Sequence, residues 1–115
     1  MINKALMDKL LKFRSDRDWE QFHNLRTLST SIVLEAAELA EFTQWAKDEE
    51  LEGIVEARRH EIEEEVADLT ILLAYLANDL GIDLEAAVAK KLEINGRRYP
   101  IEKAKGTARK YDKFD

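Results

Sequence analysis

The chain has 115 residues, of which 45% are hydrophobic and 37% charged, and it holds only four Gly and one Pro. This composition favours long helices over a many-stranded sheet, and the absence of Cys excludes disulfides, thiolate metal sites and a cysteine nucleophile. The net charge is −6, and neither an apolar stretch of about 18 residues nor a signal-peptide-like start is present. We therefore expect a single all-α domain over residues 1–115, located in the cytoplasm and without a membrane partner.

The N-terminal segment predicts one short helix followed by a loop. Apolar residues recur at helical spacing from about Lys4 to Phe13. The segment SDRDWEQFHN then interrupts the pattern with residues that compete for backbone hydrogen bonds. We expect a loop here that carries two large rings, Trp19 and Phe22.

Two long helices are predicted for the middle of the chain. The first spans roughly Leu25 to Lys47 and the second roughly Ile54 to Leu80, with the acidic stretch DEELEG connecting them. From Val66 to Ala77 the second is apolar on most of its circumference, and so small a protein cannot bury every face of a helix by itself. This predicts self-association, as a homodimer or as a homotetramer built from two dimers.

A fourth helix follows a well-marked boundary. Gly81 suits the left-handed stop of the preceding helix, and Asp83 is a natural N-cap. The fourth helix must end near Arg98, because Pro100 cannot continue it. Residues from about 101 to 115 form a basic, ordered or semi-ordered tail, which completes a predicted bundle of four to five helices.

Charge is distributed unevenly along these elements. Residues 35–68 hold 13 acidic residues against 3 basic ones, whereas residues 97–115 hold 7 basic residues against 3 acidic ones. An acidic middle repels nucleic acid and attracts divalent cations, and a basic tail attracts phosphate. The pattern favours a ligand that combines metal and phosphate, and disfavours a nucleic acid partner.

Two acidic pairs carry the main chemical signal. Glu35 and Glu38, like Glu65 and Asp68, stand at i and i+3, which places each pair on one helix face. Spacing alone indicates only a solvated face, because it recurs at four other pairs: Glu38/Glu41, Glu49/Glu52, Glu61/Glu64 and Asp112/Asp115. The surroundings differ, because both pairs lie on apolar stripes. The first stripe holds Leu28, Ile32, Leu39, Phe42 and Trp45, and the second continues into Leu72 and Tyr75.

Carboxylates on a core-facing stripe are costly unless a cation compensates them. Hard oxygen ligands without thiolate favour Mg²⁺, with Mn²⁺ as a substitute. Glu61 and Glu64 lie on the same stripe and are either further ligands or solvated surface. A di-iron site would need two Glu-x-x-His elements, and only Glu20 to His23 matches; His60 follows Glu56 at i+4 and has no counterpart.

The wider pattern resembles a known family. The runs IVLEAAELAEFTQW and EEEVADLTILLAYLA, with 26 residues between Glu38 and Glu65, resemble the ExxE and ExxD elements of the MazG-like all-α nucleoside triphosphate pyrophosphatases. RDWEQFHN, KLEINGRRYP and GTARKY resemble the dCTP pyrophosphatase branch and its small integron-type relatives.

The resemblance implies a helical homo-oligomer that hydrolyses a nucleoside triphosphate, such as dCTP or a modified dNTP, to the monophosphate and pyrophosphate with Mg²⁺, as a house-cleaning enzyme. It implies metal ligation by Glu35, Glu38, Glu65 and Asp68. It also implies a nucleobase pocket with Trp19, His23 and Trp45, and sugar and phosphate binding by Lys91, Asn95, Arg98 and Tyr99.

The chemistry of these side chains suits the implied roles, but each side chain also has a purely structural interpretation. Tryptophan rings can stack on a base, although Trp19 and Trp45 can equally be core or interface aromatics. His23 can bond a base edge or serve structure. Lys91, Asn95 and Arg98 align at i, i+4 and i+7 as a phosphate rail or a solvated face, and Arg109 and Lys110 could close over phosphates from the tail.

The chain departs from the family branch at two positions. Leu10 stands where the branch commonly has His, and Leu72 where it commonly has Tyr, which implies a different base or sugar selectivity. The expected chemistry is metal-assisted, in-line attack of water on phosphorus. The alternative hypothesis is a non-catalytic helical oligomer that binds a metal or a partner.

Overall fold

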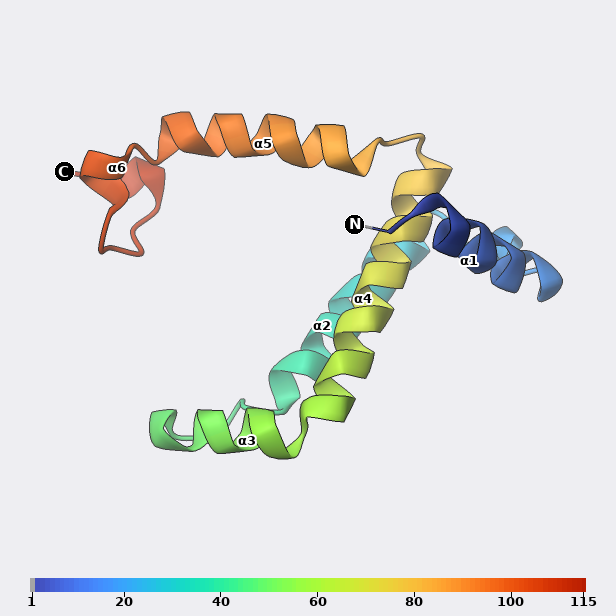
Figure 1. The fold of residues 1–115 in the computed structure, drawn as a ribbon, viewed down its shortest axis with the longest axis horizontal. Helices are drawn as coiled ribbons and strands as arrows, with labels where there is room; N and C mark the ends of the chain where they lie inside the picture. The colour runs from blue at the N-terminus through green and yellow to red at the C-terminus, as the bar shows by residue number, and fades with distance from the viewer. Residues whose placement is uncertain (1) are drawn as a thin grey trace. The chain divides into compact units, whose positions relative to one another are not determined.

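The computed structural model describes residues 2–115, and it is helical in all regular parts of that range. Six α-helices and three 3₁₀ turns are found there, and no strand, which confirms the all-α expectation for the described residues (Figure 1). The chain divides into two compact units, one ending at Gly81 and the other spanning Ile82–Asp115.

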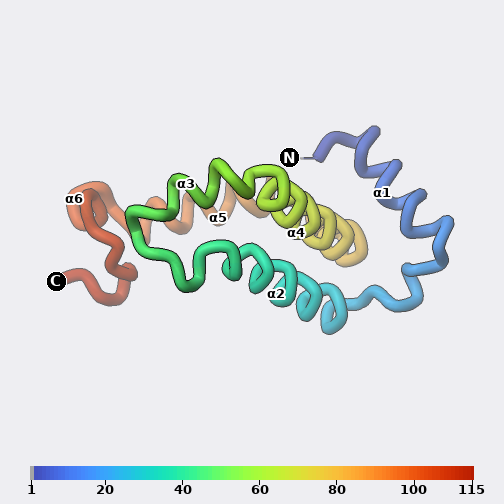
Figure 2. Tube along the Cα trace, turned by 90° about the horizontal axis from the view of Figure 1, so that it is seen from below, coloured from blue at the N-terminus to red at the C-terminus, as the bar shows by residue number. Residues whose placement is uncertain are grey.

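Two long helices form the centre of the first unit. α2 (Leu25–Glu41) and α4 (Arg59–Asp79) lie side by side and run in opposite directions, as both ribbon and tube views show (Figures 1 and 2). Asn24 starts α2, because its side chain accepts from the Thr27 backbone while the Thr27 hydroxyl accepts from the Asn24 backbone. The buried apolar residues of the unit lie on these two helices: Leu28 on α2, and Ala74, Tyr75 and Ala77 on α4.

α1 (Lys4–Asp16) crosses near the C-terminal end of α4 and is capped by Asn3, whose side chain accepts from the Leu6 backbone. The expected end at Phe13 is wrong by one turn. Arg14 is buried and pairs with Asp79 of α4, so the last turn of α1 is held against the core instead of fraying. The following loop contains a 3₁₀ turn, Glu20–Phe22, and thus agrees with the predicted interruption.

α2 ends at Glu41, six residues before the predicted Lys47. The amide of Thr43 bonds to the carbonyl of Ala40, and that of Ala46 to Thr43, so tight i to i+3 turns replace the helical bonds. The backbone of Lys47 is extended, and a 3₁₀ turn, Asp48–Glu50, follows. The apolar spacing up to Trp45 continued the helical pattern, although the backbone had already left it.

The predicted helix from Ile54 to Leu80 is in fact two helices, α3 (Leu51–Ala57) and α4. Arg58 lies between them with φ −110° and ψ 19°, outside the helical region. Its guanidinium lies 5.0 Å from the Phe42 ring centroid and forms two hydrogen bonds with the Glu61 carboxylate. The break between α3 and α4 therefore occurs at Arg58, whose side chain contacts both Phe42 at the end of α2 and Glu61 in the first turn of α4.

The second unit begins after Gly81, whose φ of +66° confirms the predicted left-handed stop. Asp83 caps α5 (Leu84–Arg98) by accepting from the Ala86 backbone, and Pro100 precedes a short helix, α6 (Ile101–Ala104), so the expected start and end are confirmed. The tail is ordered in part by rings: Tyr99 makes edge contacts with Tyr111, in the 3₁₀ turn Tyr111–Lys113, and with Phe114.

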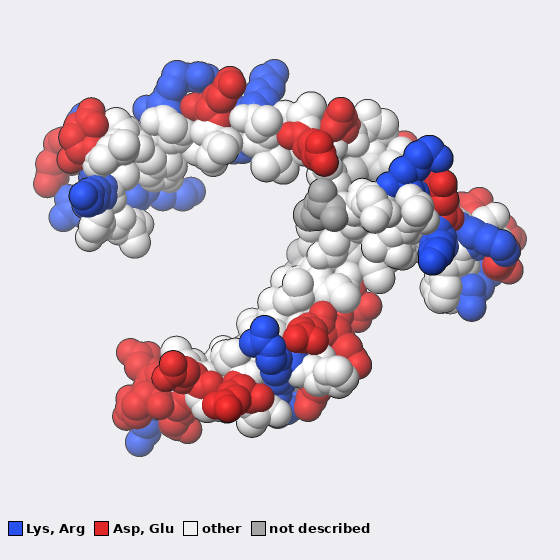
Figure 3. Space-filling view, viewed as in Figure 1, with Lys and Arg blue, Asp and Glu red and all other residues white. Residues whose placement is uncertain are grey.

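Much apolar surface stays exposed on the first unit. The exposed fraction is 64% for Val33, 60% for Leu34 and 48% for Val66, all on α2 or α4. Acidic side chains gather over α3 and the turn before it, where Asp48, Glu49, Glu50, Glu52 and Glu56 are exposed (Figure 3). Within residues 2–115, no helix combines the length and the apolar character needed to cross a membrane.

Candidate functional site

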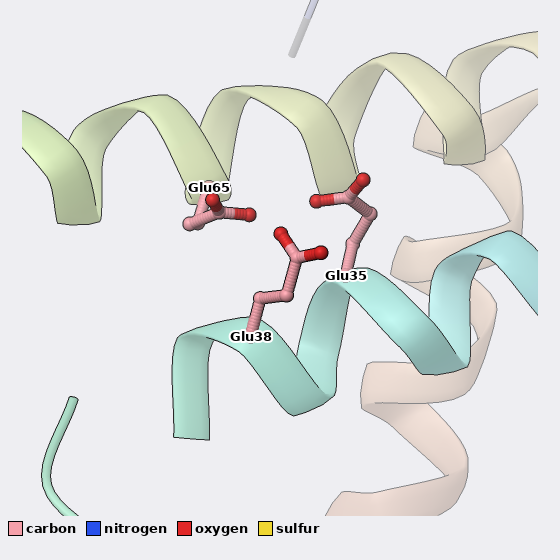
Figure 4. A group of neighbouring side chains, drawn as sticks. All are labelled: Glu35, Glu38 and Glu65. Atoms are coloured by element: carbon pink, nitrogen blue, oxygen red, sulfur yellow. The ribbon is translucent and has the colours of Figure 1, made fainter. Parts of the chain in front are cut away.

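Three glutamates meet between α2 and α4. Glu35 and Glu38 project from one face of α2, and Glu65 projects toward them from α4 (Figure 4). One carboxylate oxygen from each lies within 4.8 Å of the others. The arrangement follows from the i, i+3 spacing on α2 and the antiparallel pairing with α4.

The electrostatics of this three-glutamate cluster are unfavourable by themselves. A hydrogen bond with Glu35, burial, and the charges of Glu38 and Glu35 raise the pKa of Glu65 to about 7. Oε2 of Glu35 and Oε2 of Glu65 are buried without a hydrogen-bond partner in residues 2–115. Buried, unpartnered carboxylate oxygens are a donor set that suits a hard divalent cation.

The fourth predicted ligand, Asp68, lies outside the cluster. It is exposed, one turn beyond Glu65 on α4, and lines the adjacent cavity together with Glu35. Glu61 and Glu64 also lie outside the cluster. Glu61 is engaged by Arg58, whose guanidinium lowers its pKa, and this contact favours the surface interpretation for that residue.

A cavity of about 340 Å³ adjoins the cluster. Its walls come from α1, the loop after it, α2 and α4, and they are mostly apolar: Leu10, Phe13, Trp19, His23, Glu35, Asp68, Ile71, Leu72 and Tyr75. Trp19 is 44% exposed and packs edge-on against Phe13. The structure therefore brings two of the predicted nucleobase-binding residues, Trp19 and His23, into one cavity with two of the predicted metal ligands.

Both departures from the family branch also line this cavity. Leu10 contributes from α1 and Leu72 from α4. The hydroxyl of Tyr75, the ring nearest to Leu72 on α4, donates to the Leu10 carbonyl at 2.6 Å. The cavity is consequently less polar than a His and a Tyr at those positions would make it.

Sequence reasoning missed a charged pair, Arg14 and Asp79, that contacts His23 of the cavity wall. Arg14 donates from Nη1 and Nη2 to the two carboxylate oxygens of Asp79, at 2.8 Å each, and Nη1 also donates to His23 Nδ1 at 3.2 Å. A usable signal was present, because Arg14 stands at i+4 from Leu10 and i+7 from Met7 on an apolar stripe.

Trp45, the third predicted ring of the nucleobase pocket, lies elsewhere. It follows the end of α2, is 89% exposed and does not line the cavity. Its expected place on the buried stripe of α2 is wrong, because the helix ends before it.

The remaining predicted binding residues belong to the second unit. Lys91 is exposed and Asn95 is partly buried on α5. Three of the other four already have partners within the unit: Arg98 lies over the Tyr111 ring at 4.7 Å, Tyr99 contacts the Tyr111 and Phe114 rings, and Arg109 pairs with Asp115 at 3.1 Å. Lys110 is exposed at the start of the last 3₁₀ turn.

The chain is similar to known proteins in both sequence and structure. Residues 30–114 match the model of the MazG-like family. The chain is 43% identical over 102 residues to dCTP pyrophosphatase 1 of Homo sapiens and 42% identical to that of Bos taurus, covering 87% of this chain in each case. It spans 60% of the length of these curated relatives. The crystal structure of a pyrophosphatase from Archaeoglobus fulgidus superposes with a TM-score of 0.82 at 40% identity, covering 84% of this chain and 91% of that one.

Proposed function

The chain belongs to the MazG-like family, and on that premise we propose that it hydrolyses a nucleoside triphosphate, such as dCTP or a modified dNTP, to the monophosphate and pyrophosphate. The three-glutamate cluster beside an aromatic-walled cavity is the observation that carries the proposal. The relatives named dCTP pyrophosphatase and the archaeal structure titled a pyrophosphatase support it.

The proposed cofactor is Mg²⁺, with Mn²⁺ as a substitute. Glu35, Glu38 and Glu65 would hold it, and Asp68 would join them from the cavity wall. Two buried oxygens without partners and the raised pKa of Glu65 support this assignment, because both describe carboxylates short of positive charge. All donors are carboxylate oxygens, which Mg²⁺ prefers over nitrogen or sulfur.

The proposed chemistry is hydrolysis of a phosphoric anhydride without a covalent enzyme intermediate. When bound, a divalent cation neutralises phosphate charge and acidifies a neighbouring water molecule. The triphosphate lies at the three-glutamate cluster. A carboxylate that does not bind the cation accepts the proton of the attacking water. Water attacks phosphorus, the anhydride bond breaks, and pyrophosphate leaves in line.

The base is proposed to occupy the cavity. Stacking on an aromatic ring is worth about 1–3 kcal/mol per base in nucleic acid binders, and Trp19 is 44% exposed. The exposed Trp45 is the proposed second ring. For sugar and phosphate we propose Lys91, Asn95, Arg98, Tyr99, Arg109 and Lys110 of the second unit, although Arg98 and Arg109 would have to exchange their present partners.

We also propose that residues 1–115 act as one domain within a homodimer or homotetramer. The exposed apolar side chains of α2 and α4 support this assembly, because a monomer would leave Val33, Leu34 and Val66 in water.

A substrate panel tests the activity. Purified chain with Mg²⁺ should release pyrophosphate from at least one of the common dNTPs, NTPs or base-modified dNTPs, measured by a coupled pyrophosphate assay. The absence of release from every member, with Mg²⁺ or Mn²⁺, would contradict the proposal and favour the non-catalytic alternative. A non-hydrolysable triphosphate analogue at 100 times its Kd should stabilise an enzyme by about 2.7 kcal/mol.

A further inference from the structure

Arg14 is a buried cation that contacts two residues of the cavity wall, His23 and Tyr75. Only 5% of the residue is exposed, and its guanidinium lies 4.6 Å from the centroid of the Tyr75 ring. Two parallel hydrogen bonds tie it to Asp79 at the end of α4. This fork fixes the plane of the guanidinium, and with it the direction of its remaining N–H groups.

The second hydrogen of Arg14 Nη1 is directed to His23. Nη1 carries two hydrogens, of which one goes to Asp79 Oδ2 at 2.8 Å and the other to His23 Nδ1 at 3.2 Å. Arginine has no acceptor atom, so Nδ1 must accept and cannot carry a proton in this contact. The proton of the neutral imidazole therefore sits on Nε2.

The surroundings of His23 keep the ring neutral and fixed. Burial, followed by the nearby Arg14 charge, lowers the pKa of His23 below its ordinary value, although Asp79 and Glu20 oppose this shift. The His23 ring packs against Tyr75 with centroids 5.5 Å apart, and the Tyr75 hydroxyl is anchored on the Leu10 carbonyl. Within residues 2–115, Nε2 of His23 has no hydrogen-bond partner.

The donors that remain in the cavity wall are few. Of the lining side chains, Glu35 and Asp68 only accept when ionised, Tyr75 has used its hydroxyl, and Leu10 and Leu72 are apolar. His23 Nε2–H and the Trp19 indole N–H are thus the side-chain groups of this wall that can donate a hydrogen bond to a bound molecule.

We propose that Arg14 is a positioning residue that holds His23 as a neutral Nε2–H donor for an acceptor atom of the substrate's base, either a carbonyl oxygen or an unprotonated ring nitrogen. The role of the base rests on the proposed function. The tautomer of His23 does not, because it follows from contacts present in the chain alone.

Nitrogen-15 NMR of the ligand-free protein tests the tautomer. His23 should show an unprotonated Nδ1 and a protonated Nε2, and the chain's other histidine, His60, serves as an internal reference because its side chain is 96% exposed. The double variant Arg14→Met/Asp79→Asn removes the guanidinium without leaving the Asp79 carboxylate unpaired, and it should shift His23 toward a mixture of tautomers. A protonated Nδ1 in the unmodified chain would overturn the inference.

Steady-state kinetics test the role in binding. Loss of a hydrogen bond between neutral groups is worth about 0.5–1.5 kcal/mol, so Arg14→Met/Asp79→Asn should raise KM about 2- to 13-fold with little change in kcat. His23→Leu should raise KM similarly, whereas His23→Gln, which retains an N–H donor, should recover most of the loss. In the His23→Leu background the Arg14 and Asp79 changes should add nothing, and additive effects would overturn the inference.

The same two substitutions on an exposed pair provide a matched control. Lys12 and Asp16 pair on α1 at 2.7 Å with side chains 75% and 54% exposed, and Lys12→Met/Asp16→Asn should leave both KM and the His23 tautomer unchanged. A change in either would assign the effect to α1 in general. A chain inactive toward every nucleotide overturns the proposed function and the role of the base, while the NMR result still decides whether Arg14 sets the tautomer.

Discussion

Two groups of partly buried charges in the first unit are compensated in opposite ways. The Arg14–Asp79 pair brings opposite charges together with two parallel hydrogen bonds and leaves only Arg14 Nε without a partner in residues 2–115. The three-glutamate cluster brings like charges together, leaves two oxygens without partners, and is joined by no basic side chain of that range. Burial of charge alone thus does not indicate a ligand site; the missing counter-charge does.

The largest expected effect breaks the cluster. Glu38→Gln keeps the shape of the side chain and removes one charge, and it should lower kcat more than about 100-fold, because even groups that only support metal ligands cost 10- to 100-fold. Glu41→Gln, at the next acidic residue of α2, is the matched control and should stay active. Pyrophosphate release measures both, and equal losses in the two variants would contradict a special role for the cluster.

The second effect breaks the compensated pair. Arg14→Met leaves Asp79 without its counter-charge and should cost about 2 kcal/mol of unfolding free energy, below the 3–5 kcal/mol of a fully buried pair because the Asp79 side chain remains 28% exposed. Adding Asp79→Asn should restore part of the loss. Urea unfolding measures both, and an unchanged midpoint for Arg14→Met would show that the pair contributes no stability.

The third effect concerns pH. A folded-state pKa of about 7 for Glu65, above its ordinary value, means that the folded protein holds the proton more tightly, so stability without metal should fall as pH rises from about 5 to about 8. The lowered pKa of His23 acts in the opposite direction, because stability then rises as pH increases through its ordinary value.

Comparing the parent chain with Glu65→Gln isolates the glutamate, because His23 contributes equally to both. The thermal midpoint of the variant should fall less over this interval, and Mg²⁺ should raise the parent's midpoint more at high pH than at low pH. Parallel pH curves for the two chains would refute the coupling.

The smallest expected effect tests whether burial is the reason that the Arg14–Asp79 pair contributes to folding stability. Arg58 and Glu61 form a comparable fork, but their side chains are 49% and 54% exposed. Solvent screens such a pair, so Arg58→Ala should lower the urea unfolding midpoint much less than Arg14→Met does. A loss as large as that of Arg14→Met would show that geometry, and not burial, governs these pairs.

The sequence predicted the features that depend on local pattern. Helical period gave the helix class, and Gly81 and Asp83 marked their boundary correctly. The apolar stripes singled out Glu35, Glu38, Glu65 and Asp68 from the other acidic pairs, and the first three of these meet in the structure. Each of these depends on residues within a few positions of one another.

Features that depend on tertiary contact were not predictable in this way. The end of α2 at Glu41 and the break at Arg58 occur inside a continuing helical pattern, because side chains from separate helices meet there. The cavity exists because the loop with Trp19 and His23 lies against α4, and no local spacing encodes that approach. Asp79, 65 residues beyond Arg14, is a partner of the same kind.

The two tryptophans differ in their surroundings, so the fluorescence of each can report on a different part of the molecule. Trp19 lines the cavity and Trp45 is 89% exposed, and the chain holds no other tryptophan. With Trp45→Phe, indole fluorescence should report occupancy of the cavity alone. With Trp19→Phe, quenching by iodide in the absence of nucleotide should report whether another copy of the chain covers Trp45. Occupancy of the cavity and assembly of the ligand-free chain can thus be followed separately by fluorescence, without an added dye.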